Sequence, residues 1–161
     1  MVEKLKTAKK FIFLEYFIIR PGKMWRTILE VLEEKVKEGV DVRLMYDDFG
    51  TINKLPYNFK KKMLQKGIKV INFNPYRPKL SMFMNYRDHR KIAVIDGNIG
   101  FTGGANLADE YINLDTKFGY WKDSAIMIEG QAVWNLTLLF LQTWEFSSKD
   151  VEEYEQFKPT L

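Results

Sequence analysis

Two side chains in the middle of the sequence, the imidazole of His89 and the ammonium of Lys91, have the types and spacing to do chemistry together. His89 is the only histidine in the chain. Side chains two residues apart in an extended strand point to the same face, so His89 and Lys91 should share one face, while Arg90 and Ile92 point to the other. The apolar run 92–95 predicts that this strand is buried.

A glycine pair and an asparagine follow this strand closely. Gly103 and Gly104 lack a Cβ, so the backbone there can come close to whatever His89 and Lys91 face. Asn106 then supplies an amide donor, and it is also predicted to cap a short helix over residues 107–111. These residues make this stretch the predicted functional centre of the chain.

Composition limits both the domain organisation and the chemistry. The 161 residues suffice for one domain with a real core, predicted over 1–146, and a charged tail or linker stub over 147–161. The sequence has no cysteine and one histidine, which excludes disulfides and thiolate metal sites and argues against zinc. We therefore expect no cofactor, and a reaction that is metal-free or uses oxygen ligands.

The charge balance bears on the partner. Lys and Arg total 25 against 21 Asp and Glu, a net charge of +4. This is far below the charge of a dedicated nucleic-acid binder, and it suits an anionic substrate or a membrane surface. The longest uncharged run, 130–144, is shorter than the roughly 18–20 residues that span a bilayer. The first residues lack the apolar core of a signal peptide, so a soluble intracellular domain is expected.

Alternating strand and helix patterns predict the fold class. Runs of β-branched and aromatic residues alternate with apolar residues at helical spacing. Strand, helix, strand, helix, strand in this order implies right-handed crossovers. We therefore predict an α/β fold with a mostly parallel, mixed sheet that is flanked by helices on both faces. The predicted strands are 11–19, 40–46, 68–73, 92–95 and 124–129, and the long predicted helices are 24–38, 55–66 and 133–146.

Two apolar segments each allow two interpretations. The long loop 74–88 carries an apolar cluster, residues 80–84, among positive charges. That cluster would suit a lipid surface if exposed, and it could equally tuck into the core. The helix 133–146 is apolar around nearly its whole circumference, which predicts burial either at the centre of the domain or in an interface.

The spacing His-x-Lys-x4-Asp-x6-Gly-Gly-x-Asn resembles the signature of the phospholipase D superfamily. The flanking segments 14–18, 73–75, 85–87 and 118–123 resemble the amino-terminal catalytic half of bacterial cardiolipin synthases, and the likeness extends from about Leu5 to Phe146. It implies a phospholipase D-like fold. The six motif positions are filled by His89, Lys91, Asp96, Gly103, Gly104 and Asn106.

The resemblance also implies a mechanism, in which a phosphohistidine forms without a metal. His89 would be the nucleophile, and Lys91 and Asn106 would hold the non-bridging phosphate oxygens. Asp123 would hydrogen-bond the other imidazole nitrogen and fix its tautomer.

Other residues near the motif have alternative roles. Asp96 is a candidate catalytic residue, although a carboxylate before a glycine often only stabilises a turn. Glu15 is either a partner behind the site or a buried ion pair. The candidate substrate-binding residues are Gly103, Gly104, Arg87 and Glu15.

The implied two-step reaction needs a second histidine, which this sequence does not contain. Either a homodimer mate contributes its own motif across a two-fold axis, or a missing carboxyl-terminal half does. The synthases also have amino-terminal membrane helices, and many superfamily members carry serine where Gly104 stands. The chain therefore resembles half of an enzyme, and the helix 133–146 is a candidate for the surface that such pairing would cover.

Three functions follow as hypotheses. The first is a cardiolipin synthase domain, which transfers a phosphatidyl group between two phosphatidylglycerol molecules and releases glycerol. The second is a homodimeric phosphodiesterase or nuclease of the same fold, and the third is an inactive half that only binds phosphate or lipid. The first implies an anionic phospholipid substrate, no specific nucleic acid, and a parent enzyme at the cytoplasmic side of the cell membrane.

Overall fold

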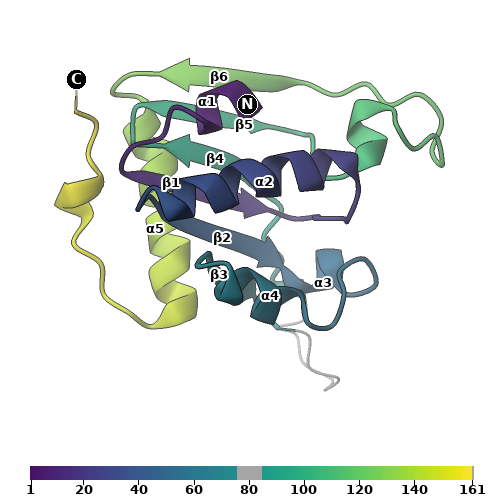
Figure 1. The fold of residues 1–161 in the computed structure, drawn as a ribbon, viewed down its shortest axis with the longest axis horizontal. Helices are drawn as coiled ribbons and strands as arrows, with labels where there is room; N and C mark the ends of the chain where they lie inside the picture. Colours follow the sequence, from purple (N-terminus) through teal and green to yellow (C-terminus); the bar gives the residue numbers. More distant parts are fainter. Residues whose placement is uncertain (76–84, 161) are drawn as a thin grey trace.

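A computed structural model describes residues 1–75 and 85–160 (Figure 1). Its six strands form one sheet in the order β3-β2-β1-β4-β5-β6. Helix α2 covers one face of this sheet and helix α5 the other (Figure 1). The elements are α1 (Val2–Leu5), β1 (Phe11–Tyr16), α2 (Lys23–Lys37), β2 (Asp41–Asp47), α3 (Asp48–Thr51), α4 (Phe59–Gln65), β3 (Lys69–Phe73), β4 (Lys91–Ile95), β5 (Ile99–Gly103), the 3₁₀ helix η2 (Asp109–Ile112), β6 (Ala125–Glu129), α5 (Val133–Ser148) and the 3₁₀ helix η3 (Tyr154–Phe157).

The predicted mixed sheet is confirmed, but among the described strands it is not mostly parallel, because two strand pairs are parallel and three are antiparallel. Strands β1, β2 and β3 pair in parallel through helical crossovers, as the sequence predicts. The pairs β1–β4, β4–β5 and β5–β6 are all antiparallel. Parallel pairing is therefore confined to the first half of the chain.

Strand β5 has no counterpart in the prediction from sequence. It is short and contains two glycines, which carry little strand propensity of their own. Its position comes from a tight turn, in which Asp96 and Gly97 adopt left-handed conformations with φ of 52° and 69°. This turn reverses the chain after β4 and lays β5 beside it.

Each face of the sheet has its own apolar core. One core joins Ile12 and Leu14 of β1 to Trp25 and Leu32 of α2. The other joins Phe13 to α5, where the rings of Phe13 and Phe140 stack with centroids 4.5 Å apart. Alternate residues of β1 thus serve opposite layers, which confirms the prediction of helices on both faces.

Helix α5 buries one side against its own sheet. Phe140 and Leu141 are fully buried there, whereas Leu139 and Phe146 are 40% and 68% exposed. The sequence predicts that this helix is buried either at the centre of the domain or in an interface. Packing within the domain accounts for its buried side. No helix in residues 1–75 and 85–160 is long and apolar enough to cross a membrane. The apolar cluster 80–84 lies outside the described residues.

The segment after α5, predicted as a charged tail or linker stub, packs back onto the domain. Phe157 in η3 is 5% exposed, and its ring lies edge-on to Phe11 and Phe13 with centroids 5.1 and 5.2 Å away. Glu152 forms an ion pair with Arg43 of β2 at 2.5 Å. We therefore propose that the folded unit includes these residues.

Replacing Phe157 by alanine tests this proposal. Phe157→Ala should lower the free energy of unfolding by about 3–5 kcal/mol, because it removes a buried ring from the core. Val151, 94% exposed in the same segment, provides the control: Val151→Ala should change it by no more than about 0.5 kcal/mol. Equal effects in urea unfolding would contradict a packed segment.

Candidate active site

The candidate site lies at one edge of the sheet, where β1 and β2 end and β4 begins. Strand β4 is antiparallel to β1, so its first residue, Lys91, pairs with the last residue of β1, Tyr16. Strand β2 ends alongside at Asp47. His89 precedes β4 by two residues and therefore lies at this edge.

His89 and Lys91 are in contact on one face of the chain, as their spacing predicts. The Nζ atom of Lys91 lies 3.0 Å from Nδ1 of His89, and Nζ also donates to the His89 carbonyl oxygen. The Phe17 ring packs against both side chains, with its centroid 4.7 Å from the imidazole and 5.6 Å from Nζ. Burial lowers the pKa of the Lys91 ammonium, against the opposing effect of Asp88 and Asp123. The imidazole itself is exposed.

Asn106 is held in one orientation at the same end of the sheet, next to the residues that follow β1. Its side chain is buried, Oδ1 accepts a hydrogen bond of 2.9 Å from the Ile18 amide, and Nδ2 donates to the Tyr111 hydroxyl at 2.9 Å. An amide nitrogen carries two protons, so one N–H can serve a phosphate oxygen. The predicted capping role is wrong, because η2 begins only at Asp109 and has Ala108 before it.

Gly103 and Gly104 give room to the start of β6. A Cβ on Gly103 would lie 2.4 Å from the Ser124 carbonyl oxygen, and one on Gly104 would lie 2.1 Å from Oδ1 of Asp123. The Gly104 amide donates to the Ser124 carbonyl oxygen at 3.0 Å. The glycines thus let Asp123 approach the site, and substrate binding by them stays a prediction.

Asp123 lies near the site without touching the imidazole. Its carboxylate accepts hydrogen bonds from the Trp121 indole at 3.1 Å and from the Ser124 amide at 2.7 Å. It is exposed, and it is close enough to Lys91 to influence the pKa of that ammonium. The hydrogen bond from His89 to Asp123 stays a prediction.

Arg87 is held by Asp47, a residue that the sequence analysis did not single out. Nη1 of Arg87 lies 3.4 Å from Oδ1 of Asp47 and 3.1 Å from the Asn74 carbonyl oxygen. Asp47 is completely buried at the end of β2. The sequence signal that could have identified Asp47 is a carboxylate at the carboxyl end of a predicted strand, because functional residues gather at that edge of such sheets. Substrate binding by Arg87 stays a prediction.

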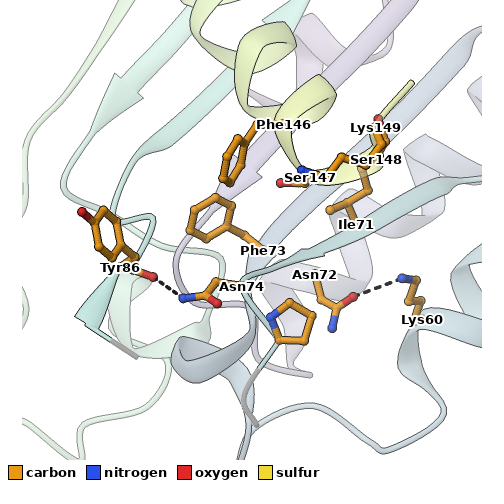
Figure 2. A pocket seen from close by; sticks show the side chains of 11 residues that line it. Lys60, Ile71, Asn72, Phe73, Asn74, Tyr86, Phe146, Ser147, Ser148 and Lys149 are labelled. Atoms are coloured by element: carbon orange, nitrogen blue, oxygen red, sulfur yellow. Dashed lines mark hydrogen bonds between the residues drawn. The ribbon is translucent and has the colours of Figure 1, made fainter. Parts of the chain in front are cut away.

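A pocket of about 700 Å³ lies nearby, between the end of β3 and the end of α5 (Figure 2). On its wall, Nδ2 of Asn74 donates to the Tyr86 carbonyl oxygen at 2.7 Å (Figure 2). Lys60, which also lines the pocket, donates to Asn72 at 3.1 Å. The Asn74–Tyr86 bond ties the end of β3 to the segment that leads into His89.

Glu15 is a buried residue behind the site and does not contact substrate directly. Its side chain is fully buried, and Oε1 lies 2.7 Å from Nε of Arg90. Burial, together with the neighbouring carboxyl group of Asp88, raises the pKa of the Glu15 carboxyl to about 9. Glu15 is also a predicted substrate-binding residue. The structure excludes this direct contact, because no carboxyl oxygen of Glu15 reaches the surface.

Asp96 is a structural residue, contrary to its assignment as a catalytic candidate. It follows the last residue of β4, whereas Lys91 is the first residue of that strand and His89 precedes it. Its carboxylate accepts hydrogen bonds from the amides of Lys9 and Lys10, both at 2.8 Å, and of Phe11 at 2.9 Å. A carboxylate engaged by three backbone amides at the opposite end of the strand holds the turn and cannot reach the imidazole.

Solved structures share this fold. Nuc from Salmonella typhimurium, a phospholipase D family member, superposes with a TM-score of 0.65 over 91% of this chain and 85% of its own, at 16% identity. Phosphatidylserine synthase from Haemophilus influenzae superposes with a TM-score of 0.68 over 97% of this chain and 38% of its own, at 14% identity. The chain thus has the phospholipase D-like fold, with the His89–Lys91 pair at one end of its sheet.

The family follows from sequence comparison. The model of the family described as "Cardiolipin synthase, PLD-like domain" matches residues 1–134, and the chain belongs to this family. Cardiolipin synthase 2 of Bacillus anthracis is 42% identical over 98% of the chain. An uncharacterized protein of Streptococcus mutans is 53% identical over 94% of it. The chain spans about a third of the length of these relatives, 31% and 33%.

Asp96→Ala and Asp123→Ala separate structural from site carboxylates. Asp96→Ala should lower the free energy of unfolding by about 2–3 kcal/mol, since three amides lose a charged acceptor. It should leave inorganic phosphate binding, followed through the imidazole NMR signals of His89, unchanged. Asp123→Ala should change the free energy of unfolding little and alter phosphate binding, because this exposed carboxylate lies close enough to Lys91 to influence its pKa. A folded Asp96→Ala protein that no longer binds phosphate would restore the catalytic assignment.

The raised pKa of Glu15 predicts an unusual pH dependence of stability. Between its ordinary value of 4.5 and about 9, the native carboxyl holds a proton that the unfolded chain has released. The free energy of unfolding should therefore fall with rising pH in this window, by up to about 1.4 kcal/mol per unit relative to Glu15→Gln, which cannot titrate. Urea unfolding at pH 5 to 9 measures this difference. A difference that rises with pH would mean an ionised Glu15 paired with Arg90.

Proposed function

We propose that this chain is one catalytic half of a cardiolipin synthase-type phosphatidyltransferase. The observation that carries the proposal is the 42% identity to a cardiolipin synthase over 98% of the chain. The pairing of His89 with Lys91 at the sheet edge supports it. The substrate is phosphatidylglycerol, an anionic phospholipid, and the site acts at a membrane surface on the cytoplasmic side.

In the first step His89 attacks the phosphorus of one phosphatidylglycerol. The bond from nitrogen to phosphorus forms as the bond from phosphorus to the glycerol oxygen breaks. The histidine of a second motif gives its proton to that oxygen, and glycerol leaves. The phosphatidyl group is then held on His89.

In the second step the glycerol hydroxyl of another phosphatidylglycerol attacks the same phosphorus. Its proton passes to the second histidine, and the bond between His89 and phosphorus breaks. The product is cardiolipin, and both histidines return to their starting protonation states. No net proton is gained or lost over the cycle.

Lys91 and Asn106 stabilise the charge that develops on the phosphoryl oxygens. In the free site the Lys91 ammonium can only donate, so Nδ1 of His89 accepts from it. A bound phosphate offers Lys91 a charged acceptor in place of the imidazole. The single ring proton then moves to Nδ1, which donates a hydrogen bond to Asp123, and the other ring nitrogen is left without a proton and free to attack.

The second motif comes from a homodimer mate or from another segment of a longer protein. The fold occurs both in Nuc, of which this chain covers 85%, and within phosphatidylserine synthase, of which it covers 38%. Strand β6 forms the outer edge of the sheet and exposes Ile126 and Met127, at 58% and 48%. An apolar edge strand of this kind suits pairing with a second domain better than α5 does, because α5 packs on its own sheet.

Phosphatidylglycerol vesicles test the proposal. The protein should form cardiolipin and release an equal amount of glycerol, which mass spectrometry and an enzymatic glycerol assay measure. His89→Ala should lower the rate at least about 10³-fold by removing the nucleophile. Tyr57→Ala, at a fully exposed residue of the loop before α4, is the matched control and should keep the wild-type rate.

Other outcomes would contradict the proposal and identify the alternatives. Metal-independent cleavage of DNA without any lipid product would indicate a homodimeric phosphodiesterase or nuclease. Phosphate binding without turnover of either substrate, in a homodimer that brings two copies of the motif together, would indicate an inactive half. Cardiolipin formation that survives His89→Ala would exclude a phosphohistidine on this residue.

A further inference from the structure

The two residues that flank His89 point away from the site and are anchored beneath it. Asp88 is buried at 6% exposure, and Arg90 is partly buried, whereas the His89 side chain between them is exposed. Alternation along the extended chain separates the flanking residues from the imidazole. The position of His89 therefore depends on what holds Asp88 and Arg90.

Asp88 is held from strand β2 and by its own neighbour. Its amide donates to Oδ2 of Asp47 at 3.0 Å, and Asp47 is fully buried. Its Oδ1 accepts from both the amide and Nε of Arg90, each at 3.2 Å. The backbone on both sides of His89 is thus closed into a small hydrogen-bonded loop.

Arg90 connects this loop to β1 and to α5. Its Nε lies 2.7 Å from Oε1 of Glu15, and its Nη2 donates to the Thr143 hydroxyl. Glu15 lies in β1 directly opposite Ile92, one position along from the Tyr16–Lys91 pair. The segment that carries His89 is therefore tied to two strands and a helix.

Three oxygen atoms in this cluster lack a hydrogen-bond partner among the described residues. They are both carboxyl oxygens of Glu15 and Oδ2 of Asp88, and all three are buried. The Nε–H of Arg90 is directed at Asp88, so its short distance to Glu15 gives no aligned hydrogen bond to that carboxyl. When two adjacent buried carboxyl groups share one proton, the protonated group donates a hydrogen bond to the other. One oxygen on each group then has a partner.

We propose that Glu15, in its protonated form and hydrogen-bonded to Asp88, is a positioning residue that fixes the backbone on which His89 is presented. The inference rests on the proposed role of His89 as nucleophile. Glu15 touches neither substrate nor the imidazole, and it acts through Asp88 and Arg90. A nucleophile on an exposed segment needs such support, because a misplacement of about 1 Å can lower a rate roughly 10²-fold.

The single histidine makes the proposal directly measurable. With isotope-labelled histidine, the chain gives one set of imidazole NMR signals, which report the ring environment of His89 and its titration by inorganic phosphate. Glu15→Gln should keep these signals and bind phosphate within about twofold of wild type, because its amide donates to Asp88 as the protonated carboxyl does. Glu15→Leu should shift and broaden them and weaken phosphate binding roughly tenfold.

Two further variants keep the test decisive. Arg90→Met, at a partly exposed residue, breaks the same connection by removing the cation beside Glu15 and Asp88, so it should reproduce the Glu15→Leu result even if Glu15→Leu fails to fold. Glu152→Leu removes a carboxylate from the Arg43 ion pair of the core formed by β1 and α5, and it should leave the His89 signals unchanged.

Three results would overturn the proposal. A Glu15→Gln protein that behaves like Glu15→Leu would require an ionised Glu15. Unchanged His89 signals in folded Glu15→Leu or in Arg90→Met would remove any positioning role, and altered signals in Glu152→Leu would show a general loss of packing. These readouts do not depend on turnover of lipid, so they separate this inference from the proposed function.

Discussion

The alternation of side chains where the chain enters β4 is the constraint on which the site depends. His89 and Lys91 meet on one side, with Nζ of Lys91 3.0 Å from Nδ1. Asp88 and Arg90 point to the other side. There Asp47 of β2 accepts from the Asp88 amide, and a carboxyl oxygen of Glu15 in β1 lies 2.7 Å from Nε of Arg90. One short segment thus presents reactive groups to solvent and fastens itself to the core, because successive residues of extended chain point in opposite directions.

The order and direction of the strands place this segment at the edge of the sheet where β1 and β2 end. Strand β4 runs against β1, so the entrance to β4 meets the ends of β1 and β2. Asn106, after the β4–β5 hairpin, returns to the same edge and bonds the Ile18 amide just beyond β1. A fully parallel sheet would have put the start of β4 at the opposite edge. The antiparallel half of the sheet therefore brings His89, Lys91 and Asn106 together.

The site has an open side, which agrees with the view of this chain as one half of a larger catalytic unit. His89 is exposed, and Asp123 nearby bonds Trp121 and Ser124. The strand that follows Asp123 is the edge strand β6, with apolar side chains exposed on it. Under the proposed function, these elements are the ones that we expect a second phosphate-binding half to meet.

The sequence by itself determined the motif, the family and most of the elements, because these depend on local spacing and apolar periodicity. It predicted the shared face of His89 and Lys91 from the two-residue repeat of a strand, and it left Glu15 open between two roles. Only the tertiary structure decided that Asp96 holds a turn and that Glu15 is enclosed beside Asp88 and Arg90. It also decided the position of β5 and the contact of Asp47 with Asp88. Those outcomes depend on which strands become neighbours, and contacts between distant residues leave no periodic signal in the chain.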